Sequence, residues 1–488
     1  MTKALLPFFL ITLFSLKSFS QTEIVSLSNI YKKKFHYPDQ TVPLTNSNNN
    51  YFSINFFRGK FINSYLFDEK NQLVDSLKSE NKQREYKQIF GKTILANNDY
   101  VVFLSNNNRH KFASLNLSYS KGTIEFTELN LDLKNEKIIQ TADYNNTFHV
   151  FTVQNNSSII NVYKFENAET YIKIPINFSD KVFVNRKDKG TTLFDLLTIN
   201  SGLYGLGKSV DIAKIEMKNP TSLEVACNPT KFYHDSDKVI ISFDQNISFT
   251  QFIEINLDTY TGKVRQFEKP LNAVNPKEND NNSFLHKGIL YHITVGKRRI
   301  HLNAKNYSTG NLIQHYYANE NEEIKFKNST IVQTGGTFDS YREFDQTSTL
   351  LRKIRRGKVG IAVHEQDNLN RITFGGIIET KSNPGMAFPG FGIPLASMGA
   401  VTVFFNPAFF AFESYSNTKA LTVEGLFDEN FVHQQGALKE NAFDRMNEFE
   451  EEERISMLAR TMFSRNENLL LGSFDQYTRK FTLWSFDR

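Results

Sequence analysis

The sequence predicts an all-β protein, a β-propeller of about seven irregular blades with loop and short-helix insertions. Two observations lead to this prediction. Short segments with alternating or continuous apolar residues recur along nearly the whole chain and end at Asn, Asp or Gly turns. These segments come in sets of three joined by short polar turns, which is typical of four-stranded antiparallel sheets repeated around a ring. Tandem β-sandwiches are the alternative, because they would explain the strands equally well locally.

The predicted strands fall into consecutive sets along the chain. The sets comprise residues 100–104, 111–119 and 123–131, then 147–153, 159–165 and 170–178, then 238–244, 249–257 and 263–268, then 288–295, 299–306 and 311–317, and finally 455–463, 468–474 and 480–486. Counting such units predicts blade starts near residues 51, 86, 137, 222, 283, 348 and 455. Gly262 and Gly310 each end a predicted hairpin turn, where a positive φ is needed. We expect the last strands to complete a blade with an N-terminal strand near Ile24 to Ile30.

The first twenty residues have the layout of a secretory signal peptide. Lys3 gives a positive start, Ala4 to Leu16 are nearly all apolar, and small residues stand at positions minus three and minus one before Gln21. We therefore expect residues 1–20 to be cleaved and residues 21–488 to form a single domain that is periplasmic or otherwise exported. The apolar stretch is too short to anchor the mature chain as a transmembrane helix.

Composition excludes several classes of function. The net charge of +5 is too weak and too scattered for a nucleic-acid-binding protein. The single cysteine excludes an intramolecular disulfide framework and a Cys-rich zinc site, and Val225-Ala226-Cys227 reads as a small buried apolar segment. The ten histidines are dispersed without the helical zinc spacing, and nucleophile elbows are absent. We therefore nominate no catalytic residue, no metal ligand and no cofactor, and favour a non-enzymatic role over an enzymatic one.

Residues 202–209, Gly-Leu-Tyr-Gly-Leu-Gly-Lys-Ser, match the phosphate-loop pattern. Val239 to Asp244 also resembles the apolar strand ending in Asp that helps to hold Mg²⁺ in such proteins. A functional loop of this kind needs a strand before it and a helix after it, in a parallel sheet covered by helices. The surrounding sequence does not predict that sheet, so a glycine-rich connection is the preferred interpretation.

Four insertions interrupt the strand pattern, near residues 179–221, 318–350, 382–412 and 436–454. Residues 318–350 are polar and predict a loop. In the last insertion Ala442, Phe443, Met446 and Phe449 share one helical face. The basic cluster Arg352–Lys358 predicts a short helix that closes at Gly357, and presents either a solvated face or a surface for an anionic partner.

The most informative segment is 382–412, which contains no charged residue. Its four prolines and four glycines argue against a membrane-spanning helix and favour an extended loop, followed by a hairpin that turns at Asn406-Pro407. The segment either lines the inside of a blade or projects as an apolar element into a partner. For the second interpretation the predicted partner-binding residues are Phe388, Phe391, Ile393, Leu395, Phe404, Phe405, Phe409 and Phe410.

The signal peptide, the Asn/Lys/Phe-rich strands and the ragged blades resemble function-unknown exported β-propeller proteins of Gram-negative bacteria. The apolar insertion is also similar in character to plug-type periplasmic subunits of outer-membrane protein-export translocons. This resemblance implies a non-enzymatic protein-interaction module of the bacterial envelope, associated with an outer-membrane barrel complex. A propeller enzyme with carboxylates around the central channel, or a propeller that binds glycans through aromatic platforms, is the alternative.

Overall fold

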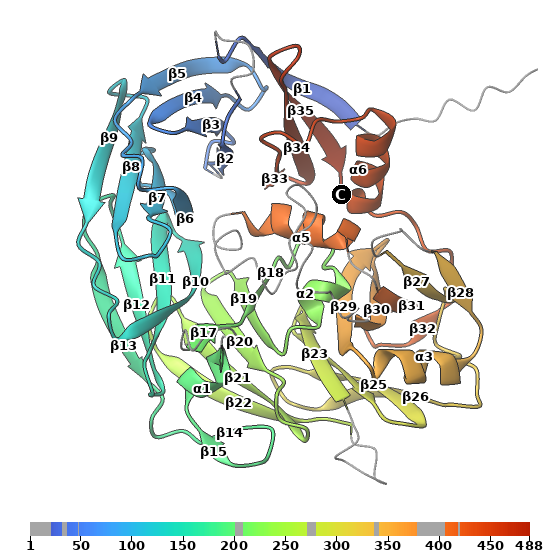
Figure 1. Cartoon of the computed structure of the whole chain (residues 1–488). Coiled ribbons are helices and arrows are strands. Elements are labelled where there is room, and N and C mark those ends of the chain that lie inside the picture. Colours follow the sequence, from blue (N-terminus) through green and yellow to red (C-terminus); the bar gives the residue numbers. More distant parts are fainter. Residues whose placement is uncertain are drawn as a thin grey trace, which may run out of the picture.

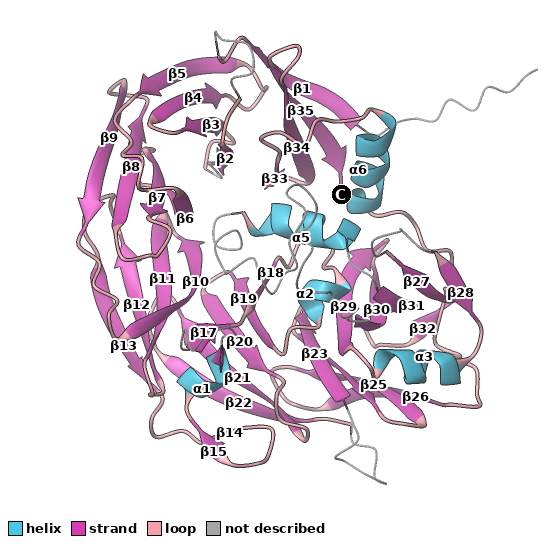
Figure 2. Cartoon of the chain, in the orientation of Figure 1, coloured by secondary structure: helices cyan, strands magenta, loops and turns pink. Residues whose placement is uncertain are grey.

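The computed structural model describes residues 21–31, 37–46, 48–200, 208–270, 280–335, 341–377, 406–417 and 420–488. Within these residues, seven antiparallel sheets of four or more strands follow one another around a ring (Figure 1). Strands dominate the chain and the helices are short (Figure 2). The chain is therefore an all-β propeller with seven blades, as predicted.

The first three blades are regular four-stranded sheets in sequence order. Blade 1 contains β2 (Gln40–Thr45), β3 (Phe52–Arg58), β4 (Phe61–Phe67) and β5 (Leu73–Ser79); blade 2 contains β6 (Gln88–Ile94), β7 (Tyr100–Ser105), β8 (Phe112–Ser118) and β9 (Thr123–Leu129); blade 3 contains β10 (Glu136–Tyr144), β11 (Thr147–Gln154), β12 (Ile159–Phe165) and β13 (Ile172–Asn177). Strand β7 is buried along its whole length, whereas the outer strand β13 is mostly exposed. The middle strands therefore form the core between neighbouring blades.

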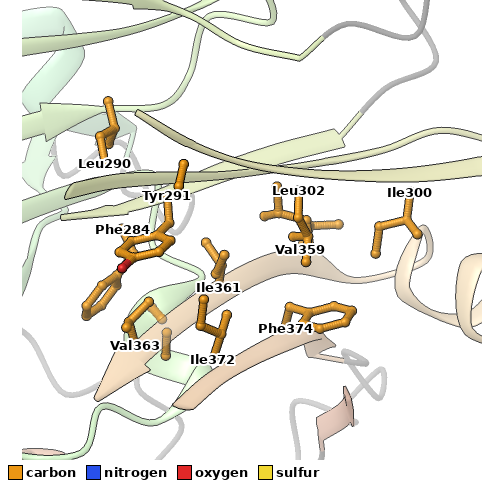
Figure 3. Packing of buried hydrophobic residues seen from close by; sticks show 14 of the residues in the cluster. Phe284, Leu290, Tyr291, Ile300, Leu302, Val359, Ile361, Val363, Ile372 and Phe374 are labelled. Atoms are coloured by element: carbon orange, nitrogen blue, oxygen red, sulfur yellow. The ribbon is translucent and has the colours of Figure 1, made fainter. Parts of the chain in front are cut away.

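Blades 4 to 6 carry additions to this plan. Blade 4 contains β19 (Thr230–Asp235), β20 (Lys238–Phe243), β21 (Phe249–Asn256) and β22 (Gly262–Glu268), with β18 (Ala213–Ile215) parallel to β19 on its inner side; blade 5 contains β23 (Asp280–His286), β24 (Ile289–Val295), β25 (Arg299–Asn306) and β26 (Leu312–Asn319); blade 6 contains β29 (Lys358–Gln366), β30 (Leu369–Ile377), β31 (Ala420–Phe427), β27 (Ile331–Thr334) and β28 (Arg342–Phe344), with β32 (His433–Gln434) paired to β31. Phe284 and Tyr291 of blade 5 pack with Ile361 and Phe374 of blade 6 in one apolar cluster (Figure 3).

The N-terminal strand closes the ring, as predicted. Blade 7 contains β33 (Thr461–Arg465), β34 (Asn468–Asp475), β35 (Lys480–Asp487) and, outermost, β1 (Gln21–Ser28). Strand β1 pairs antiparallel with β35, from Gln21 opposite Phe486 to Ser28 opposite Lys480. Apolar residues of blades 1 and 7 form one core cluster that includes Phe56 and Phe481, whose ring centroids lie 4.9 Å apart. Pairing the last strand in this way covers a sheet edge that would otherwise be exposed.

The structure corrects several details of the predicted fold. Blade 1 starts at Gln40 rather than near residue 51. Its first strand is not evident in the sequence because it contains Pro43, and β2 tolerates this proline because it lies at the edge of its sheet. Part of 318–350 forms β27 and β28 instead of a loop, because Ile331 supplies a buried anchor. Gly310 has the expected positive φ of 80°, but in the other turn Tyr260 takes the positive φ, of 51°. Gly262 is needed instead because a Cβ would collide with Phe178.

Five helices lie in the described part of the chain: α1 (Leu193–Leu197), α2 (Leu223–Ala226), α3 (Thr347–Ile354), α5 (Pro407–Asn417) and α6 (Ala442–Glu452). Helix α6 buries the four residues that its sequence predicted, and an Asn441–Asp444 capping box fixes its start. Helix α3 ends shortly before Gly357, also as predicted. Figure 1 shows α2, α5 and β18 near the centre of the ring, so segments of the chain itself occupy this region.

Candidate functional site

The apolar insertion replaces the turn between two paired strands of blade 6. Strand β30 ends at Ile377 and β31 begins at Ala420, and these two residues face each other in the register. The blade is thus completed by pairing across the insertion. Six of the predicted partner-binding residues, Phe388, Phe391, Ile393, Leu395, Phe404 and Phe405, lie outside the described residues.

The predicted hairpin at Asn406-Pro407 is wrong, because helix α5 begins there. The Asn406 side chain accepts a hydrogen bond from the Phe409 backbone N–H at 3.2 Å. Asn at the N-cap followed by Pro at the first helical position is a strong helix-start signal. The Asn side chain accepts a hydrogen bond from an unpaired backbone N–H of the first turn, and Pro has no N–H that would need a partner there. The insertion therefore returns to the propeller through a helix, which also carries Phe409 and Phe410.

Helix α5 is anchored through its apolar side. Ala408, Ala411 and Phe412 are buried with residues of α6 and of blade 7, and Phe409 is partly buried against them. The Phe412 and Phe443 rings meet edge to face at 5.4 Å. The structure thus assigns Phe409 to the base of the insertion, where it contributes packing to the propeller.

Arg460 ties this base together. Its guanidinium lies 2.7 Å from Glu413 of α5 and 2.5 Å from Glu450 of α6, and it lies over the rings of Phe409 and Phe412 at 5.6 and 5.7 Å. The Arg460 side chain is only 6% exposed, so these charges interact in a largely desolvated place. Burial raises the pKa of Glu450 despite the opposing effect of Arg460. Helices α5 and α6 are therefore held to each other and to blade 7 by a charged contact as well as by apolar packing.

A second polar cluster lies on the inner strands of blades 2, 3 and 4. Thr93 donates a hydrogen bond to Asp143 at 2.6 Å, and Lys214 of β18 donates to the Thr141 carbonyl at 3.0 Å. Asp143 is exposed to solvent, yet protein atoms surround it closely enough that burial raises its pKa to about 6. Burial also lowers the pKa of Lys92 to about 8 and raises the pKa of Glu216.

This cluster could exchange protons near neutral pH, because its groups have pKa values shifted toward that range. Its two lysines and two carboxylates nevertheless balance one another, and Lys214 fastens the inner strand β18 to blade 3. No spacing in the sequence signals these residues, because they come from strands that are distant along the chain and meet only when the ring closes. We interpret the cluster as a set of polar contacts that hold strand β18 against blade 3.

The structure describes only the last two residues of the phosphate-loop pattern, Lys208 and Ser209. Its glycines fall in residues 201–207, outside the described residues. Lys208 and Ser209 belong to β17 (Lys208–Val210), which pairs antiparallel with β16 (Thr198–Asn200), and Lys208 forms an ion pair with Asp195. Asp244 is fully buried between Lys231 and Lys269, at 3.1 and 3.4 Å. These residues therefore have structural partners, and no helix follows the loop to present its N–H groups to a phosphate.

A cavity of about 680 Å³ lies beside helix α1 and strand β16. Its lining residues include Arg186, Thr191, Thr192, Asp195, Asp211 and Gln245, although most of the surface that they and their neighbours expose to the cavity is apolar. Among the described residues that line it, none is an aromatic platform of the kind that glycan binding was expected to use.

Cys227 is buried, as expected; burial raises the pKa of its thiol to about 12, and the thiol donates to the Lys358 carbonyl at 3.1 Å. Among the residues described, no three His, Cys, Asp or Glu side chains converge on a possible metal position. In the same residues, no helix is both long and apolar enough to cross a bilayer.

Comparison with known proteins adds little to this description. No protein-family model matches the chain, and no curated protein matches it. Among solved structures, the Dos1 propeller is similar at 8% identity with a TM-score of 0.28, covering 90% of this chain and 76% of its own. The β-propeller domain of Nup133 from Vanderwaltozyma polyspora is similar at 10% identity with a TM-score of 0.25, covering 70% of this chain and 81% of its own. Scores this low carry no argument, so the fold assignment depends on the sheets themselves.

Proposed function

We propose that this chain is an exported, non-enzymatic protein-interaction module of the bacterial envelope, and that the apolar insertion 382–412 is its docking element. The partner proposed is an envelope protein, such as the barrel of an outer-membrane protein-export complex, for which the propeller acts as an accessory or plug subunit. The observation that carries the proposal is the position of the insertion. An uncharged segment rich in Phe interrupts a blade whose strands still pair across the gap.

The anchoring of α5 supports a docking role. An apolar element that inserts into a partner binds more tightly when its ends are rigidly anchored, because a preorganised element loses less conformational entropy on binding. Arg460, Glu413 and Glu450 supply such a base where the insertion returns to the propeller. The ring itself is closed by β1 and does not need the insertion to complete a blade.

The test replaces Gly385–Leu395 by a short Gly/Ser linker and measures both folding and capture of a partner from native envelopes. We expect an unchanged melting temperature and loss of capture, because each Phe buried in a partner contributes about 1.5–3 kcal/mol before association costs. A matched control, Phe61→Ser with Tyr477→Ser, changes two exposed aromatic residues elsewhere and should keep capture. A sharp fall in melting temperature without separable loss of capture would show that the insertion is part of the core.

A further inference from the structure

A row of arginines lies on the rim of blade 6 from which the insertion departs. Helix α3 leads directly into β29, whose first residue, Lys358, pairs with Ile377, and Ile377 in turn pairs with Ala420. The C-terminal end of α3 and both ends of the insertion therefore share one rim of the propeller. The sequence alone did not place these two features together.

Helix α3 and the turn that follows it combine buried apolar residues with exposed basic residues. Leu350, Leu351 and Ile354 are buried in the core between blades 5 and 6. Arg352, in the last turn of α3, and Arg355 and Arg356, in the turn that follows the helix, are all exposed. We call these three arginines the basic rim.

The basic rim has no acidic partner in the part of the chain that the structure describes: no hydrogen bond or ion pair joins its guanidinium groups to a carboxylate. Lys353, between them, differs, because its ammonium donates to Gln333 at 2.9 Å and lies over the Phe344 ring at 4.5 Å. Like charges at these spacings repel one another, and the helix C-terminus offsets part of that cost. An anion bound from outside the protein would offset the remaining repulsion between the three arginines.

We propose that the basic rim binds the phosphate headgroups of an anionic lipid surface. A guanidinium group forms paired hydrogen bonds with phosphate oxygens, and three exposed guanidinium groups at one helix end suit an array of phosphates better than a single carboxylate. The basic rim precedes Lys358, which pairs with Ile377, the last described residue before the uncharged segment 382–412. Basic and apolar residues together are the combination that binds membrane interfaces. This inference goes beyond the proposed function, because its ligand is lipid and its test contains no protein partner.

The test measures co-sedimentation with vesicles of phosphatidylcholine containing roughly a third phosphatidylglycerol, and with vesicles of phosphatidylcholine alone. The variant R352Q/R355Q/R356Q should partition to the anionic vesicles at least about tenfold less than the wild type, because each basic residue near such a surface contributes substantially to binding. Wild-type binding should weaken as salt is raised. The control K121Q/K137Q/K187Q removes the same charge from exposed sites on other blades and should bind like the wild type.

Three results would overturn the inference. Equal losses in the two triple variants would mean that net charge, and not the basic rim, drives binding. Equal wild-type binding to neutral and anionic vesicles would mean that apolar contacts drive it. A lower melting temperature for R352Q/R355Q/R356Q with unchanged partitioning would assign the arginines to the helix end alone. The Gly/Ser linker variant should still bind anionic vesicles, so failure of the docking proposal and failure of this inference are distinguishable.

Discussion

At the scale of single residues, Arg460 has the greatest effect on how the insertion is held. It contacts a carboxylate from each of α5 and α6 and lies over two Phe rings of α5. Removing one partner of a buried ion pair is costly, because the remaining charge stays desolvated and uncompensated.

Arg460→Ala should therefore lower the free energy of unfolding by about 3 kcal/mol, measured by urea denaturation. Exposed Arg84 is the control, and its replacement by Ala should change stability by less than about 0.5 kcal/mol. Adding Glu450→Gln to Arg460→Ala should recover part of the loss, because the unpaired carboxylate is then neutral. Equal stabilities for the two arginine variants would contradict this account of the base.

Buried histidines predict how stability responds to pH. Burial lowers the pKa of His149 and His286 to about 4 and that of His292 to about 3. Because these values lie below the ordinary value of about 6.5, the unfolded chain binds more protons between pH 4 and 6.5. Stability should then fall as pH is lowered through that window. Asp143, with its pKa raised to about 6, has the opposite effect, since its folded form binds the extra proton.

The sum favours acid destabilisation, because the pKa is lowered by burial for eight of the described histidines and raised by burial for only five of the described carboxyl groups. We expect the urea midpoint to decrease steadily from pH 6.5 to pH 4.5, with each histidine contributing at most about 1.4 kcal/mol per pH unit. A midpoint that is constant, or that rises toward low pH, would show that these histidines are not buried as neutral groups.

At the scale of elements, the closing strand β1 is the critical one. It forms the outer edge of blade 7, and its residues Val25 and Leu27 belong to the core shared with blade 1. Arg465 strengthens the same seam by donating to the carbonyls of Asn50 and Glu69 and lying 4.6 Å above the Phe52 ring. The two ends of the chain thus depend on each other for stability.

Deleting residues 21–28 should expose the edge of β35 and cause aggregation, observed by light scattering and size-exclusion chromatography. A synthetic peptide of residues 21–31 added during refolding should restore the monomer, because it can pair with β35 in the native register. A deletion variant that stays monomeric with an unchanged melting profile would contradict closure by β1.

How far the sequence predicted these elements depended on local signals. Strands such as β7 and β34 were predictable because continuous apolar residues end at clear turns. Strand β2 was missed because Pro43 breaks that signal, and its edge position becomes evident only in the sheet. Helix α5 was missed because its Asn-Pro start can also mark a turn, and burial of Phe412 against α6 decides between the two.

The sequence identified the insertion but not its surroundings. A charge-free stretch is visible along the chain, whereas the contact of Arg460 with Glu413 joins residues that are far apart in sequence. The same limit applies to the basic rim, whose nearness to Ile377 follows from strand register alone. Such neighbours are set by the closure of the ring, which no local pattern encodes.

At the scale of the whole molecule, a closed seven-bladed ring carries an uncharged insertion between β30 and β31, for which we propose a docking role. The most direct test places the photo-crosslinking residue p-benzoylphenylalanine at Phe391, with Tyr477 as the control site, in the full chain within its native envelope. The account predicts that position 391 crosslinks to one envelope protein while position 477, which is exposed on blade 7, does not. Crosslinks from position 391 confined to blades of the same chain would contradict it.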